Sequence, residues 1–207
     1  EGGVGLQAFT IVSKSPRGQN IESNSGDTDN ITLLAIINMW PLRTWTSLKE
    51  RALFQAGMFH KYAAESGGKL TVIKSSGDMA AYLAKRATAK GITAGFLGVE
   101  GAQVLEGKLE NVDVMFQAGI RMMSPAHFFD SDIGGSAHGM AKGGLTPLGR
   151  EVLKRMESLG MVVDLAHASS QTIDDALSIA TRPVVVSHTG VRGTCDNQRN
   201  LSDDQLR

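Results

Sequence analysis

Four side chains that could bind a divalent cation each follow a short apolar run in this sequence. They are Glu100, His127, His167 and His188. Glu100 ends the apolar part of the stretch AGFLGVEGAQVL, while His167 and His188 occupy similar places in MVVDLAHAS and PVVVSHTG. Imidazole and carboxylate groups together form the ligand set of Zn²⁺ and related ions. The pattern therefore indicates a metal site whose ligands lie far apart along the chain.

Six apolar runs are typical of buried strands and would position these four side chains. They cover residues 4–12, 70–73, 92–99, 120–123, 161–165 and 184–186. Most of the runs are continuous rather than alternating, which suits strands that are covered on both faces. In a parallel α/β barrel the carboxyl ends of all strands meet at one face, which holds the active site. We therefore expect the carboxylate and the three histidines to converge at that face.

Helix signals alternate with the apolar runs. A capping box at Ser47 begins a helix that ends near residues 67–68. Asp78 is expected to cap a second helix, and Thr146 followed by proline begins a third that a glycine closes at residue 160. Ser169 or Ser170 opens a fourth. The alternation of strand and helix predicts a parallel α/β sheet.

Composition limits the classes of protein that this chain can belong to. The 207 residues are 42% hydrophobic with a formal net charge of zero, so we expect one domain spanning residues 1–207 and no nucleic-acid partner. No apolar run reaches the length of a transmembrane segment. The one cysteine, Cys195, excludes an intrachain disulfide framework, and it has no CxxC partner. The compartment, whether bacterial cytoplasm or periplasm, stays open.

Other polar residues have simpler interpretations. A single glutamate or histidine at a strand end is more often structural than a ligand, so both interpretations stay open for each of the four residues, although their recurrence favours a metal site. We expect His60 to lie at the surface of a helix or at the edge of the core, and Asp164 to make a structural hydrogen bond. His138 lies in the glycine-rich loop 130–144, where a structural place in the loop is expected and a ligand or substrate contact stays open, and Asp130 and Asp132 are candidate caps of that loop. The loop could cradle a phosphate, but it lacks the spacing of a Walker motif.

Three longer stretches of the sequence resemble the zinc-dependent membrane (renal) dipeptidases and their bacterial relatives. The stretches are GVEGAQVL, GLTPLGREVLKRMESLGMVVDLAHAS and RPVVVSHTGVRGTCDNQRNLSDDQLR, and the opening GGVGLQAFTIV matches more loosely. The resemblance implies a (β/α)₈ TIM barrel that binds two zinc ions and hydrolyses dipeptides. It also implies that a homodimer is possible.

The resemblance assigns roles to individual residues. It implies that Glu100 bridges both metal ions, while His167 and His188 bind the second ion. His127 matches a histidine that contacts the substrate and the tetrahedral intermediate. Arg199 matches an arginine that holds the terminal carboxylate of the substrate, a task that suits the bidentate guanidinium group.

The sequence departs from the family pattern in two places. The family binds its first metal ion with a His-x-Asp pair on the first strand, and no His-x-Asp occurs here. The family also has an essential aspartate after a late strand, beyond the last residue of this chain. We therefore expect an incomplete barrel, with about six of the eight βα units, cut from a longer chain at both ends.

Three functions are consistent with these observations. The first is a metallo-dipeptidase in which a metal-activated water attacks the peptide bond. The second is a lactonase or phosphotriesterase of the amidohydrolase type on the same barrel, because fold alone does not fix function. The third is an inactive fragment that binds one ion or none.

Overall fold

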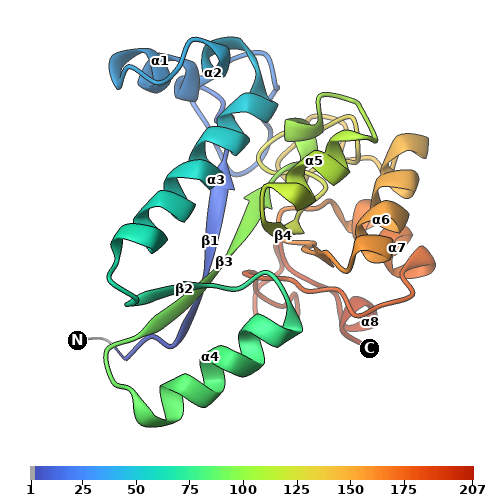
Figure 1. Cartoon of the computed structure of the whole chain (residues 1–207). Coiled ribbons are helices and arrows are strands. Elements are labelled where there is room, and N and C mark those ends of the chain that lie inside the picture. The colour runs from blue at the N-terminus through green and yellow to red at the C-terminus, as the bar shows by residue number, and fades with distance from the viewer. Residues whose placement is uncertain (1–2) are drawn as a thin grey trace.

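Five short strands form a parallel sheet in the computed structural model, which describes residues 3–207 (Figure 1). The strands are β1 (Leu6–Val12), β2 (Leu70–Val72), β3 (Thr93–Glu100), β4 (Ile120–Met123) and β5 (Val162–Val163). The sheet order is β1-β3-β4-β5, and β2 also pairs with β3. All of these pairs are parallel, which confirms the predicted α/β class.

Strand β3 is the centre of this sheet. It pairs with β1 along nearly its whole length, from Leu6 opposite Ala94 to Val12 opposite Glu100. Its other edge is shared, because β2 pairs with residues 93–95 and β4 with residues 97–99. The end of β3, where Glu100 lies, is therefore held by a neighbour on each side.

The prediction of a sixth strand at residues 184–186 is wrong. This segment instead makes an isolated parallel bridge between Val185 and Asp164. Two features interrupt its pairing with β5. The preceding residue of the ladder is Pro183, which has no N–H group to donate. On the other side, the N–H group of Ser187 donates to the Asp164 side chain at 3.0 Å instead of to the backbone.

The helices that the sequence predicts are all present, and others accompany them. The α-helices are α1 (Asn30–Ile37), α2 (Arg43–Thr46), α3 (Leu48–Glu65), α4 (Ser76–Thr88), α5 (Asn111–Gln117), α6 (Pro147–Leu159), α7 (Ser170–Ile179) and α8 (Asp203–Leu206), with a 3₁₀ turn, η1 (Ala102–Leu105). Ser47, Thr146 and Ser169 cap α3, α6 and α7, as predicted.

The predicted cap of α4 is wrong. Ser75, in an extended conformation, is the N-cap, and its hydroxyl accepts a hydrogen bond from the N–H group of Asp78 at 3.1 Å. Asp78 lies inside the first turn, where its carboxylate accepts from the N–H group of Lys74 at 2.9 Å. An N-cap needs extended backbone, and Ser75 has it whereas Asp78 is already helical.

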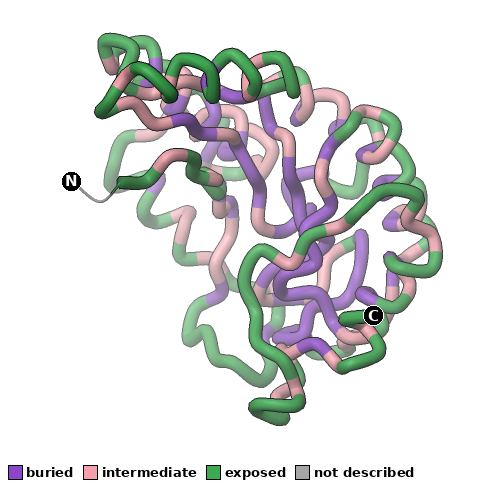
Figure 2. The backbone as a smooth tube through the Cα atoms, turned by 90° about the horizontal axis from the view of Figure 1, so that it is seen from below, coloured by how far each residue is buried: buried purple, intermediate pink, exposed green. Residues whose placement is uncertain are grey.

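The helices cover both faces of the sheet. Helix α3 packs on β1 and β2, α5 packs on β4, and α6 packs on β5. Helix α3 also contacts α5, α5 contacts α6, and α6 contacts α7, so these four helices form one layer. Helix α4 packs on the other face of β3, because Tyr82 contacts Ala94 whereas the next residue, Gly95, lies against Phe59 of α3. The main core lies between the sheet and the layer formed by α3, α5, α6 and α7, and Figure 2 shows the buried residues gathered in the interior of the molecule.

A buried arginine fixes the long connection between β1 and α3. Arg51 is 1% exposed, and its guanidinium donates to the carbonyl groups of Ser13 at 2.9 Å and Trp45 at 2.8 Å. It also donates to the Thr32 hydroxyl at 2.7 Å and forms an ion pair with Asp29 at 2.6 Å. One side chain thus holds the loop after β1 and the α1–α2 segment against α3.

Replacing Arg51 by methionine should destabilise the fold. The change removes the cation that pairs with the Asp29 carboxylate and removes the donor of three carbonyl groups, and the loss of one partner of a buried ion pair costs about 3–5 kcal/mol. Urea unfolding followed by circular dichroism measures the free energy of unfolding. The matched control is Arg155→Met, which breaks the exposed ion pair with Asp113. Equal losses in the two variants would contradict the role assigned to Arg51.

The same ion pair should make stability depend on pH. Burial opposes the ionisation of Asp29, but hydrogen bonds from Thr32, Arg51 and the backbone outweigh it and hold the pKa of Asp29 below its usual value. The stability gained from the ionised form is complete above the unfolded-state pKa of about 3.9 and is lost as pH falls through the lower folded-state value. Below about pH 4, the free energy of unfolding should therefore fall less steeply in Asp29→Asn than in the unmodified protein. Asp204→Asn, at an exposed carboxylate, should keep the original slope.

Candidate metal and substrate site

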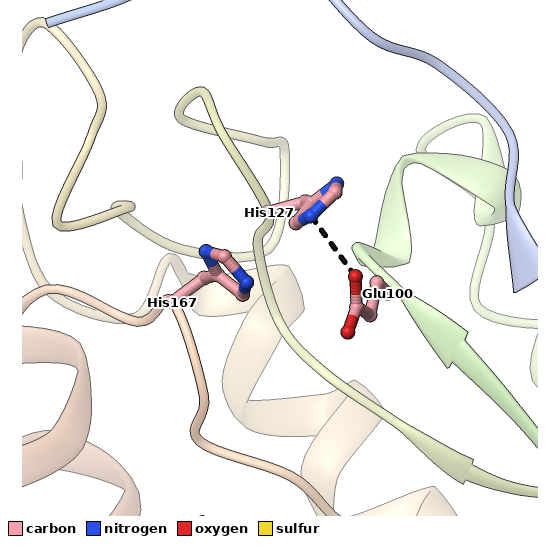
Figure 3. Close-up of side chains that lie close together, drawn as sticks. All are labelled: Glu100, His127 and His167. Carbon is pink, nitrogen blue, oxygen red and sulfur yellow. Dashed lines mark ion pairs between the residues drawn. The ribbon is translucent and has the colours of Figure 1, made fainter. Parts of the chain in front are cut away.

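The predicted convergence at the carboxyl ends of the strands is present. Glu100 ends β3, His127 follows β4, His167 follows β5, and His188 follows the bridge that Val185 makes. Because the strands are parallel, these positions share one edge of the sheet. Figure 3 shows Glu100, His127 and His167 directed toward one another, and one ligand atom from each lies within 4.8 Å of the other two.

His188 lies close enough to Glu100 and His167 to belong to the same group of side chains. His127 Nε2 lies 3.0 Å from one Glu100 oxygen, and His188 Nε2 lies 3.9 Å from the other. His188 Nε2 is also 2.8 Å from His167 Nε2. The structure thus brings together all three predicted metal ligands, Glu100, His167 and His188, with His127 beside them.

The protonation states at this site suit a cation. The hydrogen bond from His127 and nearby positive charge hold the pKa of Glu100 below its usual value despite burial, so its carboxylate is ionised at neutral pH. Burial, assisted by the positive charge of neighbouring groups, lowers the pKa of His167 to about 2. A metal ligand must be an ionised carboxylate or a neutral imidazole. Glu100 and His167 are therefore both ready to bind metal without losing a proton at pH 7.

A chain of hydrogen bonds fixes the tautomer of His188. The Ser187 hydroxyl donates its proton to Asp164 at 2.6 Å, so it can only accept a hydrogen bond from His188 Nδ1, which lies 3.0 Å away. The proton of the neutral His188 ring is therefore on Nδ1, and Nε2 keeps its lone pair. Such indirect support from a carboxylate orients histidine ligands in metal sites. It also confirms the structural hydrogen bond predicted for Asp164.

These donors fit a divalent cation. His167 and His188 face each other through Nε2, and two neutral rings in that arrangement can share only one proton, whereas a cation would accept both lone pairs. The Nδ1 atoms of His127 and His167 are buried without partners among residues 3–207. His167 also has a left-handed backbone, with φ of 67°. Strained backbone at a buried polar residue is common at functional sites.

The glycine-rich loop positions His127 rather than a phosphate. The Asp130 carboxylate accepts hydrogen bonds from the N–H groups of Ser136 at 2.9 Å and Ala141 at 2.7 Å, which confirms its predicted capping role. These amides are therefore not free to bind an anion. The Ser136 hydroxyl donates to the carbonyl group of His127. At Gly135 an added Cβ would lie 2.2 Å from the carbonyl oxygen of Gly143, so the loop requires glycine there.

A cavity of about 440 Å³ opens beside these histidines. Arg199 lines it together with His167, His188, Phe128, His138 and Ile21. The Arg199 guanidinium donates to the carbonyl group of His188 at 2.9 Å, which fixes its position next to the candidate metal ligands. The structure therefore places the predicted carboxylate-binding residue at the edge of a cavity large enough for a small ligand.

The burial of His138 and the role of Ser187 were not foreseen from the sequence. His138, for which both a place in the glycine-rich loop and a ligand or substrate contact were left open, is only 3% exposed, and burial lowers its pKa. Ser187 was not singled out, although it directly precedes a histidine at a strand end, and that position is the signal that could have identified it. His60 is partly buried, with Nε2 2.9 Å from the Ala118 carbonyl oxygen, which agrees with the expected location at the surface or the edge of the core. Cys195 is exposed and free.

Comparison with known proteins identifies the family. The family model described as membrane dipeptidase, peptidase family M19, matches residues 1–207. The chain belongs to the membrane dipeptidase family. Over 115 residues it is 32% identical to an uncharacterized dipeptidase of Schizosaccharomyces pombe, an alignment that covers 53% of this chain and 27% of the yeast protein.

Two solved metallopeptidase structures share the fold. The dipeptidase AC, an M19 metallopeptidase, matches with a TM-score of 0.76 and 20% identity over 96% of this chain and 56% of the other. A metallopeptidase from Rhodobacter sphaeroides, bound to a phosphinate mimic of L-Ala-D-Ala, matches with a TM-score of 0.73 and 18% identity over 98% of this chain and 57% of the other. This M19 chain therefore spans little more than half the length of those structures and about a quarter of the yeast relative. None of the helices between residues 3 and 207 is long and apolar enough to cross a membrane.

Replacing Ser187 by alanine should weaken the binding of a divalent cation, for which zinc is the probe. Without the hydroxyl, His188 loses the acceptor that fixes its tautomer, and losses of this kind lower metal affinity about 10–100-fold. Competition against a chromogenic chelator measures the dissociation constant. Ser178→Ala, which removes an exposed hydroxyl on α7, is the matched control and should bind zinc like the unmodified protein. An unchanged affinity in Ser187→Ala would refute the orienting role of Asp164 and Ser187.

Proposed function

We propose that this protein is a metal-dependent dipeptidase that uses zinc. The observation that carries the proposal is the convergence of Glu100, His167 and His188 beside a cavity lined by Arg199. Membership of the membrane dipeptidase family supports the same function. The substrate class is supported by the Rhodobacter sphaeroides relative, whose structure contains a mimic of a dipeptide.

The donor set favours zinc as the bound ion. One carboxylate and two imidazoles form a typical zinc coordination sphere, and zinc retains an open position for water in catalytic sites. Glu100 would hold the ion through its carboxylate, and a carboxylate with two oxygens could bridge a second ion, as the family resemblance implies. A bound zinc ion supplies a Lewis acid that activates water for attack on the peptide carbonyl.

The remaining side chains act on the substrate. Arg199 would hold the terminal carboxylate of a dipeptide, so that the peptide bond lies over the histidine cluster and longer peptides are excluded. His127 Nε2, which donates to Glu100 in this structure, can donate instead to the carbonyl oxygen as that atom gains negative charge. A donor that acts mainly in the transition state raises the rate rather than the affinity.

Arg199 distinguishes dipeptides from the alternative substrates, which are lactones and phosphotriesters. A lactone or phosphotriester has no terminal carboxylate and gains nothing from a guanidinium group in the cavity. The decisive comparison is between the hydrolysis of a dipeptide, its C-terminal amide and a simple lactone. A dipeptidase should prefer the free acid to both other substrates, whereas preference for the lactone would favour the alternative function.

Glu100→Gln should abolish zinc-dependent dipeptide hydrolysis. The amide keeps the shape of the side chain but removes the negative charge that binds the cation, so the rate should fall by about 10²–10³-fold or more. Release of amino acids from L-Ala-L-Ala by the zinc-loaded protein measures the reaction, and removal of zinc by a chelator should stop it. Glu110→Gln, at a site outside this cluster, is the control. Absence of zinc-dependent hydrolysis in the unmodified protein would refute the proposed function and support an inactive fragment.

A further inference from the structure

His138 is the least explained side chain around the cavity. It is almost completely buried, it lies outside the candidate metal ligands, and its ring stacks on Phe128 with 4.7 Å between centroids and 22° between planes. Phe128 in turn lies 5.0 Å from the ring of His167. His138 is thus part of the wall that faces the histidine cluster, and it lines the same cavity as Arg199.

The two ring nitrogens of His138 have different environments. Nδ1 lies 2.7 Å from the carbonyl oxygen of Ile21, so Nδ1 must carry the proton and donate it. In the neutral ring Nε2 then has a lone pair. Nε2 makes no hydrogen bond with any residue between 3 and 207, yet it is not sealed off from solvent as the Nδ1 atoms of His127 and His167 are. A buried ring that lines a cavity therefore keeps one unused acceptor.

The segment that His138 holds forms the opposite wall of the cavity. Ile21 lines the cavity, and the backbone of His138 accepts hydrogen bonds from the N–H group of Asn24 at 2.8 Å and from its side-chain amide at 3.1 Å. Gln198, next to Arg199, donates to the same Ile21 carbonyl at 3.2 Å and accepts from Lys142 at 2.7 Å. The hydrogen bonds of His138 and Gln198 thus join three segments around the cavity.

We propose that His138 is a substrate-binding residue, with Nδ1 holding the Ile21 wall in place and Nε2 accepting a hydrogen bond from an N–H group of the dipeptide. This inference rests on the proposed dipeptidase function, because it assigns the substrate donor to the same cavity. A dipeptide carries N–H groups at its amino terminus and in its peptide bond, whereas lactones and phosphotriesters carry none in the reacting unit. The acceptor of His138 and the guanidinium of Arg199 would then recognise both polar ends of a short peptide.

Two substitutions separate the two nitrogens. His138→Asn keeps a donor near the position of Nδ1 but has no acceptor near Nε2. His138→Phe keeps the ring against Phe128 but loses both nitrogens. Calorimetry of L-Ala-L-Ala binding to the metal-free protein measures the contribution of the Nε2 acceptor to the dissociation constant. Hydrogen exchange of the backbone amides of residues 20–24 measures how firmly Nδ1 holds the Ile21 wall.

We expect His138→Asn to raise the dipeptide dissociation constant about five- to tenfold, as for loss of one hydrogen bond, with exchange at residues 20–24 unchanged. His138→Phe should raise both the dissociation constant and the exchange rate. In the zinc-loaded protein, KM should rise in both variants with a smaller change in kcat, and zinc affinity should stay the same.

The outcomes that overturn the inference are specific. If His138→Asn bound the dipeptide as tightly as the unmodified protein does, the acceptor role of Nε2 would be excluded. If the amides of residues 20–24 exchanged at the same rate in His138→Phe as in the unmodified protein, the holding role of Nδ1 would be excluded. An unmodified protein that binds the dipeptide without hydrolysing it would refute the proposed function and leave this inference standing. An unmodified protein that binds no dipeptide would refute this inference as well.

Discussion

The candidate site depends on the parallel pairing of β3 with neighbours on both edges. Val12 pairs with Glu100 at the end of β1, and Val99 pairs with Met123 at the end of β4, so the last residues of β3 cannot shift along the sheet. A slip of one residue would turn the Glu100 side chain to the opposite face and away from the histidines. The register of the central strand is therefore a requirement for any chemistry at this edge.

Sequence reasoning succeeded where one local signal determined the outcome. Continuous apolar runs identified β1 to β5, the serine and threonine caps located three helices, and the strand-end positions predicted that Glu100 and His188 would meet. It failed where distant groups decide the structure. Pairing at residues 184–186 is limited by Pro183 and by the side chain of Asp164, and the burial of Arg51 depends on partners up to 38 residues away. Such partners cannot be read from a single sequence.

The cluster of titratable groups must avoid accumulating charge in a partly buried place. The structure does so by ionising Glu100, keeping His167 neutral and using Asp164 through Ser187 to fix the ring of His188. The negative charge of Glu100 thus lies beside His127 and His188. The Nε2 atoms of His167 and His188 face each other 2.8 Å apart, next to this carboxylate.

The left-handed backbone of His167 has an evolutionary consequence. With φ of 67°, the backbone at this position would be less strained with glycine or asparagine than with histidine. A laboratory selection for heat resistance alone would therefore tend to discard this histidine. The chain retains at this position a residue that costs folding free energy, so thermal robustness and function oppose each other at a single amino acid.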